Sequence, residues 1–335
     1  MKAMVLEQYG KVESSPLVLR DWPVPEPSAG QVRVKVRLCA VCRTDLHVIE
    51  RELPPAKLPV VPGHQAVGVV DALGEGCRHL RPGQRVGVAW LAHTCGRCRF
   101  CTAGKENLCE QSRYTGYHVD GGYAQYCLAE EDFVYEIPEG IDDLSAAPLL
   151  CAGIIGYRSL RRAQLPPGGT LAMYGFGSSA HVVMQIARHR GCRVYAVSRA
   201  KAHRELAAEL GACWTGERPE DLPEATDSAI LFAPAGELVP PAMAKLAKGG
   251  TMAIAGIHVS DIPPLDYQKH LFFERELRSV TANTRQDGRE LLAEAAAIPI
   301  RPHVKTYTLA QANTAMQDIK ADRINGTAVL EIGNL

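Results

Sequence analysis

Hydrophobic and polar positions follow two different patterns along the chain, and the change falls near residue 170. The first 150 residues contain short β-branched runs, such as 32–38 and 67–70, between turn signals at Pro62-Gly63 and Pro82-Gly83. Short strands separated by frequent turns are typical of a β-rich domain with many loops. We therefore expect the first part of the chain to form such a domain.

After residue 170, apolar runs alternate with segments of helical periodicity. The runs 170–174, 193–197, 228–233 and 251–255 predict strands, and 180–190 and 200–210 predict helices, the second ended by Gly211. A further helix is expected to end at Gly249-Gly250. Strands that alternate with helices indicate a parallel sheet covered by helices. We interpret this part as one doubly wound domain that ends near Val280.

The last fifty or so residues form a third segment. The sequence predicts a helix around 288–297, an alternating strand at 303–309, another helix, and a closing strand at 326–332. We expect this segment to return to the first domain. The predicted organisation is 1–152, 153–281 and 282–335.

Composition narrows the class of protein. The 335 residues include 37 basic and 37 acidic side chains, a balance that favours neither a nucleic acid nor an anionic membrane as partner. The start MKAMVLEQYG does not resemble a signal peptide, and no run of about 18 apolar residues occurs, so we expect a cytoplasmic protein. In a reducing compartment, the eleven cysteines are better explained by metal binding and buried thiols than by disulfides.

Four of the cysteines lie within 15 residues. Cys95, Cys98, Cys101 and Cys109 have the spacing C-x2-C-x2-C-x7-C, and four thiolates can close a tetrahedral shell around a structural zinc. Unrelated thiols and an iron–sulfur cluster are alternatives. A nucleic-acid-binding zinc module is another, but neither a basic stripe nor an aromatic platform accompanies the cysteines.

A glycine-rich loop follows the first predicted strand of the second domain. The strand at 170–174 leads into a G-x-G-x-x-A loop and then into a helix, which is the context that a dinucleotide fingerprint requires. Its glycines allow the backbone to approach a pyrophosphate at the helix N-terminus. A glycine-rich turn without a ligand is the alternative. The predicted binding residues are Gly175, Phe176, Gly177, Ser178, Ser179 and Ala180.

These motifs together resemble the medium-chain zinc-dependent alcohol dehydrogenase family over nearly the whole chain. The string GHQAVGVVDALG at 63–74 has the family's glycine and histidine spacing, and CRTDLH at 42–47 resembles its first ligand segment. The sequence YTGYHVDGGYAQY at 114–126 is closer to the yeast and bacterial branch. The resemblance implies a GroES-like β-rich catalytic domain, a Rossmann cofactor domain, two zinc ions per chain and a dimer or tetramer.

The resemblance also assigns roles to residues that alone would suggest only packing or a polar turn. Cys42, His64 and Cys151 would hold a catalytic zinc, because two thiolates and one imidazole leave a fourth position open. The other roles are as follows: Thr44 would hydrogen-bond the alcohol oxygen, His47 would carry the proton outward, Asp45 would orient the ligand histidine, and Arg43 would contact the cofactor pyrophosphate.

One position departs from the family pattern. The family usually has Glu after the ligand histidine, whereas this chain has Gln65, which keeps the shape and removes a negative charge. We therefore do not expect a mechanism in which a carboxylate at this position approaches the zinc.

The residues after the second strand of the cofactor domain bear on the choice of dinucleotide. NAD is typically held by a carboxylate there, but this chain has Ser198-Arg199. A hydroxyl and a guanidinium suit a 2′-phosphate, so we expect NADP(H) rather than NAD(H), with Lys201 and His203 as possible helpers.

The sequence predicts an alcohol dehydrogenase or aldehyde reductase acting on a primary or secondary alcohol or aldehyde. Trp90 and Leu91 resemble substrate-pocket positions, although both also fit an apolar core. A zinc-free quinone or enone reductase of the same superfamily would not need the cysteines. A non-catalytic dinucleotide-binding protein is a further alternative, supported only by Gln65.

Overall fold

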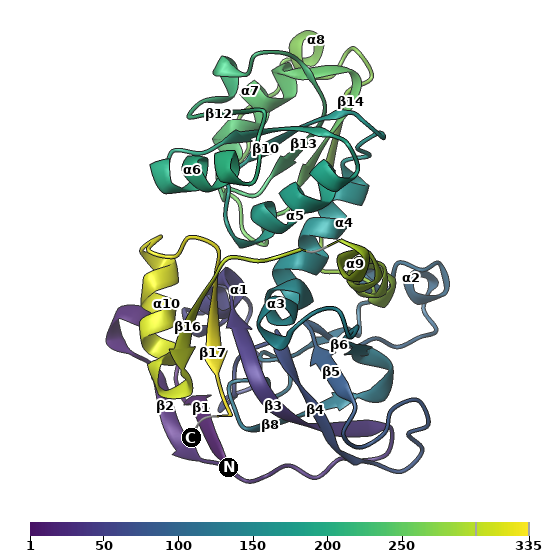
Figure 1. Cartoon of the computed structure of the whole chain (residues 1–335), viewed down its shortest axis with the longest axis vertical. Helices are drawn as coiled ribbons and strands as arrows, with labels where there is room; N and C mark the ends of the chain where they lie inside the picture. The colour runs from purple at the N-terminus through teal and green to yellow at the C-terminus, as the bar shows by residue number, and fades with distance from the viewer. Residues whose placement is uncertain (299, 334–335) are drawn as a thin grey trace. The chain divides into compact units, whose positions relative to one another are not determined.

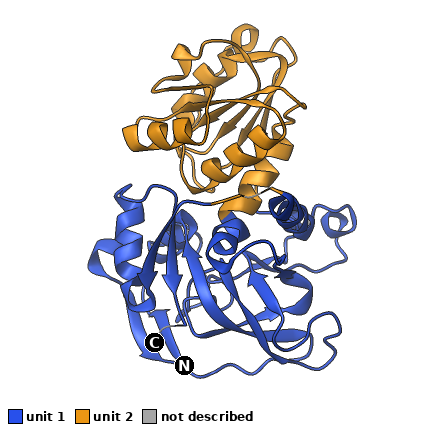
Figure 2. Ribbon diagram, viewed as in Figure 1, with its two compact units in different colours: residues 1–151, 282–297, 302–335 blue, residues 152–281, 298–301 orange. Residues whose placement is uncertain are grey.

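The computed structural model describes residues 1–298 and 300–333 and divides into two compact units (Figure 2). Unit 1 comprises Met1–Cys151, Ala282–Ala297 and Pro302–Leu335, and unit 2 comprises Ala152–Thr281 and Ile298–Arg301. The predicted third segment, 282–335, thus shares a unit with the first domain, apart from a short stretch that belongs to unit 2. Residues 299, 334 and 335 of that segment lie outside the described residues.

Unit 1 is built on a seven-stranded sheet (Figure 1). Its strands run in the order β16 (Val304–Thr308), β17 (Thr327–Glu331), β3 (Gln31–Val41), β4 (Ala66–Leu73), β5 (Arg85–Val88) and β9 (Val134–Glu136), with β8 (Tyr126–Glu130) also paired to β3. The pairs β3–β4, β4–β5, β5–β9 and β17–β3 are antiparallel, and β16–β17 is parallel. Smaller sheets pair β1 (Lys2–Leu6) with β2 (Leu17–Asp21), and β6 (Leu91–His93) with β7 (Arg113–Tyr114).

Apolar and polar side chains alternate along β3, a central strand of this sheet. Val32, Val34 and Val36 are buried, whereas the intervening Arg33 and Lys35 are more exposed. A strand repeats every two residues, so this sequence presents one apolar face to the core. The helices of unit 1 are α1 (Arg43–Ile49), α2 (Arg99–Thr102), α3 (Asp143–Pro148), α9 (Arg285–Ala297) and α10 (Ala312–Lys320), with short 3-10 turns at Val12–Ser14, Glu106–Leu108, Glu131–Phe133 and Leu309–Gln311.

Unit 2 is a parallel six-stranded sheet with helices between its strands. The strand order is β12 (Trp214–Gly216), β11 (Arg193–Val197), β10 (Thr170–Tyr174), β13 (Thr226–Leu231), β14 (Leu246–Ile254) and β15 (Glu276–Ser279). The connecting helices are α4 (Ile154–Arg162), α5 (Ser178–His189), α6 (Lys201–Glu209), α7 (Val239–Ala244) and α8 (Tyr267–His270), with 3-10 turns at Pro219–Asp221 and Gly236–Leu238. This α/β arrangement confirms the predicted doubly wound fold.

Two details of unit 2 differ from the sequence interpretation. Gly249 and Gly250 were expected to end a helix, but α7 ends at Ala244 and both glycines lie inside β14. The pairing of β14 with β13 changes register between Thr226 and Ser228, which accommodates the glycines as an irregularity in the strand. The edge strand β15 was also not predicted, because Leu277 is its one apolar residue.

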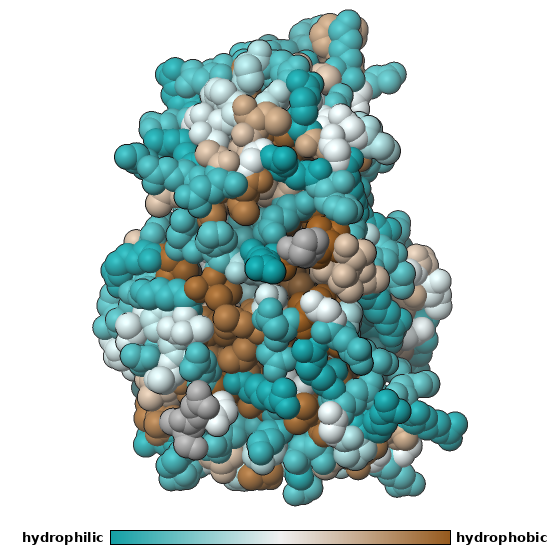
Figure 3. Space-filling model, in the orientation of Figure 1, coloured by the Kyte–Doolittle hydropathy of each residue, from teal (hydrophilic) through white to brown (hydrophobic). Residues whose placement is uncertain are grey.

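Among the described residues, no helix is long and apolar enough to cross a membrane. On the face drawn in Figure 3 most side chains are hydrophilic. A notable group of exposed large apolar residues falls in unit 2; it consists of Ile257, Ile262, Tyr267, Phe272 and Phe273.

Candidate metal centres and cofactor loop

The start of helix α1 brings together three of the predicted site residues, Cys42, Thr44 and Asp45. Cys42 is the N-cap of α1, and its sulfur accepts a hydrogen bond from the backbone N–H of Thr44 at 3.3 Å. In return, the Asp45 carboxylate accepts from the backbone N–H of Cys42 at 3.0 Å. This reciprocal capping box fixes the direction of the Cys42 side chain, and the positive end of the helix favours its thiolate.

Asp45 also fixes the second ligand. Its Oδ1 lies 3.0 Å from Nδ1 of His64, and its Oδ2 accepts a hydrogen bond from the Tyr123 hydroxyl at 3.1 Å. Both Asp45 and His64 are 1% exposed. The hydrogen bond to Nδ1 leaves Nε2 of His64 directed to the Cys42 sulfur, 3.2 Å away. Asp45 therefore holds the His64 ring in one orientation, and Tyr123 in turn holds Asp45, a contact that the sequence reasoning missed.

Cys151 completes the group from a π-helical turn, Leu149–Gly153. The possible ligand atoms of Cys42, His64 and Cys151 all lie within 4.8 Å of one another. Short π-helical turns are frequent at functional sites. The structure thus brings together three residues that lie far apart in the sequence, in the combination that leaves one position of a tetrahedral zinc site open.

The pKa of Cys42 is lowered, whereas the pKa values of Cys151 and His64 are raised, as expected for residues that share protons. The hydrogen bond from Cys151 holds the pKa of the Cys42 thiol well below its usual value, whereas the same bond and burial raise that of Cys151. Burial alone would lower the pKa of His64, but the nearby Asp45 and Cys42 charges raise it to about 10. A metal ion that binds these groups displaces their protons, so its affinity depends on pH.

Gln65 follows the ligand histidine and is fully buried. Neither its side-chain oxygen nor its side-chain nitrogen has a hydrogen-bond partner in the described part of the chain. A buried amide without partners is costly, by about 1–3 kcal/mol per unsatisfied group. Such a polar group, directly after His64 in the chain, fits a site where a water molecule or a metal ion supplies the missing partner.

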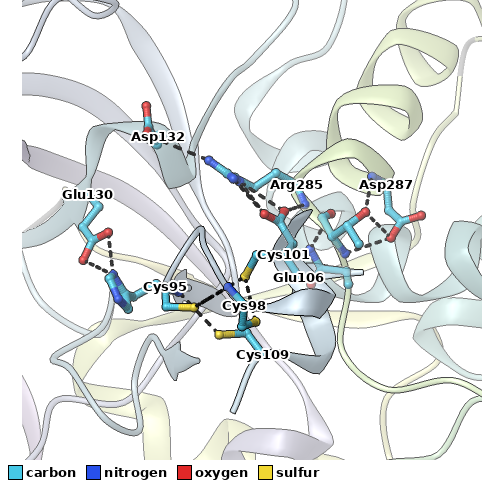
Figure 4. Close-up of polar contacts among 12 residues, drawn as sticks. Cys95, Cys98, Cys101, Glu106, Cys109, Glu130, Asp132, Arg285 and Asp287 are labelled. Atoms are coloured by element: carbon cyan, nitrogen blue, oxygen red, sulfur yellow. Dashed lines mark hydrogen bonds and ion pairs between the residues drawn. The ribbon is translucent and has the colours of Figure 1, made fainter. Parts of the chain in front are cut away.

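The four cysteines of the loop 95–109 also come together. The sulfurs of Cys98 and Cys101 lie 3.5 Å apart, and the backbone N–H groups of Cys95 and Cys98 donate to the sulfurs of Cys109 and Cys95 at 3.4 Å. All four sulfurs lie within 4.8 Å of one another and turn toward a common centre (Figure 4). Backbone N–H groups lower the pKa of Cys95 to about 6, which favours a thiolate.

This lobe has little apolar packing of its own. Helix α2, between Cys98 and Ala103, buries none of its residues. The only large apolar side chain that follows, Leu108, is exposed. A lobe of this kind gains its order from its ligands rather than from a core, which fits a structural metal ion.

The glycine-rich loop of unit 2 has the expected geometry. Gly175, at the end of β10, has a φ of 90°, and a Cβ there would lie 2.8 Å from the backbone nitrogen of Ala233. Gly177 is the N-cap of α5 and has open space where a side chain would point. Ser178, Ser179 and Ala180 form the first turn of the helix, and Phe176 is buried. An anion such as a pyrophosphate fits this helix N-terminus.

The end of the next strand carries the residues that the sequence analysis expected to distinguish dinucleotides. Ser198 follows β11, with its hydroxyl 3.4 Å from Nδ1 of His203, and Arg199 is exposed. Arg204 donates to the backbone oxygens of both residues at 2.8 Å. The sequence reasoning did not include Arg204, which adds a second guanidinium to this turn. Lys201 lies in the first turn of α6 and pairs with Glu205.

The remaining predicted residues lie in unit 1. Thr44 and His47 are partly exposed on α1, and Arg43 forms an ion pair with Asp322. The Trp90 ring lies edge-on to His64, with centroids 4.9 Å apart, and is stacked at 4.8 Å on Tyr114. Leu91 is only 2% exposed. Trp90 thus packs against His64, and both Trp90 and Leu91 are buried.

Comparison with known proteins identifies the family of the chain. Residues 28–139 match the model of the alcohol dehydrogenase GroES-like domain, and residues 180–297 match that of the zinc-binding dehydrogenases. A Mycobacterium tuberculosis protein named "Probable alcohol dehydrogenase AdhA" is 48% identical, over 99% of this chain and 97% of its own. An alcohol dehydrogenase of Geobacillus stearothermophilus is 35% identical, over 99% of this chain and all of its own.

A solved structure shows the same fold. The cinnamyl alcohol dehydrogenase of Sorghum bicolor superposes with a TM-score of 0.90 and 26% identity, over 99% of this chain and 98% of its own. The chain belongs to the medium-chain zinc-dependent alcohol dehydrogenase family. It is an oxidoreductase of a class that uses zinc and a nicotinamide cofactor, and the family supports activity as an alcohol dehydrogenase or reductase.

Proposed function

We propose that this protein is a zinc-dependent dehydrogenase that moves a hydride between NADP(H) and a primary or secondary alcohol or aldehyde. The observation that carries the proposal is the convergence of Cys42, His64 and Cys151 within 4.8 Å. Two thiolates and an imidazole suit zinc, and a three-ligand site is the arrangement of a catalytic rather than a structural centre. The four cysteines of the loop 95–109 would hold a second, structural zinc.

Each residue around this centre has a task that its position supports. A zinc ion held by the three ligands would act as a Lewis acid on the alcohol oxygen and make its proton easier to lose. Asp45 keeps the His64 ring in the orientation that presents Nε2, through its 3.0 Å contact with Nδ1. Thr44, two residues after Cys42, would hydrogen-bond the alcohol oxygen, and His47 would accept the released proton.

The proposed cofactor preference rests on the turn after β11. One hydroxyl and two guanidinium groups belong to this turn, because Ser198 and Arg199 lie beside Arg204. A guanidinium binds phosphate through charge-assisted hydrogen bonds, and these residues suit the 2′-phosphate of NADP(H). Gly175, Gly177 and the N-terminus of α5 would bind the pyrophosphate, and Arg43 would contribute once released from its exposed ion pair with Asp322.

The proposal extends to the substrate pocket and the assembly. Trp90 would form one wall of the pocket beside His64, and Leu91 would support that wall from the core. We further propose a homodimer or homotetramer that covers the exposed apolar residues near β15, since that strand is an edge of its sheet. A cytoplasmic location stays a prediction from the sequence.

The test combines metal analysis with turnover. Purified protein should contain two zinc ions per chain, and aldehyde reduction followed by nicotinamide absorbance should be faster with NADPH and should stop on chelation. Cys151→Ser should lose one zinc and nearly all turnover, whereas Cys213→Ser, which changes an exposed cysteine outside both groups, should lose neither. A zinc-loaded protein without turnover on any alcohol or aldehyde would instead favour a dinucleotide-binding protein.

A further inference from the structure

The end of helix α1 places Glu52 next to His47. The backbone N–H of Arg51 donates to the carbonyl of Val48 at 3.3 Å, and that of Glu52 donates to the carbonyl of His47 at 2.8 Å. This pair of bonds is the Schellman pattern that ends many helices, and it requires a left-handed residue. Arg51 fills that position with a φ of 60°. The chain therefore folds back so that Glu52 lies over the last turn of the helix.

The side chains of the same two residues are also in contact. Nδ1 of His47 lies 2.5 Å from Oε2 of Glu52. A carboxylate accepts hydrogen bonds, so Nδ1 carries the proton in this contact and Nε2 is left as the proton acceptor of the neutral ring. The side chain of His47 is 16% exposed and that of Glu52 is 43% exposed. The contact thus leads from a mostly buried ring to a carboxylate in water.

The carboxylate is not needed to hold the turn in place. The two backbone hydrogen bonds already define the end of α1, and the neighbouring Glu50 provides the ionic contacts of this region. Glu50 accepts from the backbone N–H of Val12 at 2.9 Å and pairs with Lys320 at 2.7 Å. The Glu52 carboxylate therefore contacts the imidazole of His47 without being needed to stabilise the turn.

We propose that Glu52 is the outer end of the proton path that serves His47, an inference that rests on the proposed dehydrogenase function. Alcohol oxidation releases one proton for each hydride transferred. When a proton reaches Nε2 of His47, the proton on Nδ1 passes to Glu52, and Glu52 then releases it to water. One proton enters and one leaves, so Glu52 is again a carboxylate and the His47 ring is again neutral, now with its proton on Nε2. Rotation of the ring or proton exchange with water then returns a proton to Nδ1 before the next cycle. In carbonyl reduction the same steps run in reverse. Glu52 acts through His47 and is a positioning and proton-accepting residue.

The experiment compares Glu52→Gln with Glu52→Asp in alcohol oxidation at low buffer concentration. Glu52→Gln keeps the shape and cannot accept the proton, so kcat should fall roughly tenfold, a small part of what general acid–base catalysis supplies, with KM little changed. Glu52→Asp should recover much of the loss. Raising the concentration of a small base such as imidazole should restore kcat of Glu52→Gln, because the base takes the proton from His47 directly.

Controls separate this role from a structural one. Glu75→Gln removes a charge from an exposed turn of the same unit and should leave kcat unchanged. In a His47→Gln background, Glu52→Gln should cause no further loss, because the two residues act in one path. A Glu52→Gln protein with unchanged kcat, or with a loss that neither depends on His47 nor responds to buffer, would overturn the proposal alone. A wild-type protein without turnover would overturn the proposed function as well.

Discussion

The carboxylate of Glu106 binds Arg285 through both its main chain and its side chain, although 179 positions separate them in the sequence. Glu106 accepts from the backbone N–H of Arg285 at 2.7 Å and from its Nε and Nη2 at 3.0 and 2.7 Å (Figure 4). Arg285 begins helix α9, and its guanidinium also lies over the ring of Phe133 at 4.6 Å. The pair joins the cysteine-rich lobe to the returning C-terminal segment of unit 1.

Replacing Glu106 should destabilise unit 1 in a pH-dependent way. Burial would raise the pKa of Glu106, but the bonds from Arg285 outweigh it and lower the pKa below the ordinary value of 4.5. The pair therefore stabilises the fold above about pH 4.5, and this contribution is lost as pH falls through the lower folded-state pKa. Glu106→Gln should reduce the free energy of unfolding by about 2 kcal/mol at neutral pH.

Urea unfolding at pH 7 and at pH 4 measures this effect. The difference between Glu106→Gln and wild type should shrink at the lower pH, which lies below the ordinary carboxyl pKa of 4.5, because the wild-type carboxyl is then largely protonated in the unfolded state. Glu110→Gln, an exposed neighbour in the same loop, should unfold like wild type at both values. A loss of equal size at both values would show that the charge of Glu106 is not what matters.

Removing a cysteine of the loop 95–109 should affect one of the two proposed metal sites and leave the other intact. Cys98→Ser removes one of four thiolates, and with no core to hold the lobe we expect it to become sensitive to protease between residues 95 and 109. The zinc content should fall from two ions per chain to one. Limited proteolysis followed by mass spectrometry checks the position of the cut, and Cys77→Ser serves as the control outside the cluster. Retention of two zinc ions by Cys98→Ser would contradict the assignment.

Asp45→Asn should weaken the catalytic metal site without removing a ligand. The amide keeps the shape but cannot accept from Cys42, His64 and Tyr123 at once, so the His64 ring loses its fixed orientation. Loss of such an outer partner typically costs about 10- to 100-fold in metal affinity. Competition with a coloured chelator measures this, and Asp21→Asn, which changes an exposed carboxylate paired with Lys2, is the matched control. Equal affinities for the two variants would show that the orientation is fixed by packing.

Gln65→Met tests whether the buried amide is kept for function. Methionine has a similar length and needs no hydrogen bonds, so the variant should be more stable by about 1 kcal/mol, because two buried groups without partners are removed. Turnover should fall if the amide serves the bound metal ion or its water. Thermal unfolding and kcat of the same preparation give both quantities. Higher stability with unchanged turnover would show that the amide has no part in catalysis.

Arg199→Ala tests the proposed cofactor preference. Loss of one guanidinium from a 2′-phosphate site should raise the KM for NADPH about tenfold, equivalent to 1.4 kcal/mol, and leave the KM for NADH nearly unchanged. Lys201→Ala, in the same turn but paired with Glu205, should have a smaller effect. If wild type itself prefers NADH, the assignment of Ser198 and Arg199 is wrong while the zinc sites are unaffected.

The sequence predicted local features best where one pattern determined them. The strand at 193–197 coincides with β11, because a short apolar run between two turns leaves little choice of boundary. The four cysteines were recognised from their spacing, since their ligand atoms come from one loop. By contrast, Cys151 was assigned only through the family resemblance, because it lies on a π-helical turn that the hydrophobic pattern does not predict.

Contacts between distant segments were beyond the sequence reasoning where the family resemblance did not name them. Tyr123 and Asp45 are 78 residues apart, and nothing in the run around Tyr123 marks it as a partner of a carboxylate. Glu52 was missed for a different reason. Its place beside His47 depends on the left-handed conformation of Arg51, and helices usually end with glycine there.

The ribosome makes the chain from its N-terminal side, so the parts of unit 1 become available for folding one after another. The cysteines of the lobe are all present once residue 109 has emerged, and the three-ligand centre is complete at residue 151, the last residue before unit 2. Strand β17, however, lies inside the sheet between β16 and β3, and it is made after all of unit 2. Until then the edge of β3 that β17 will cover remains unpaired, so a nascent chain can assemble both metal centres and unit 2 before its first sheet is closed.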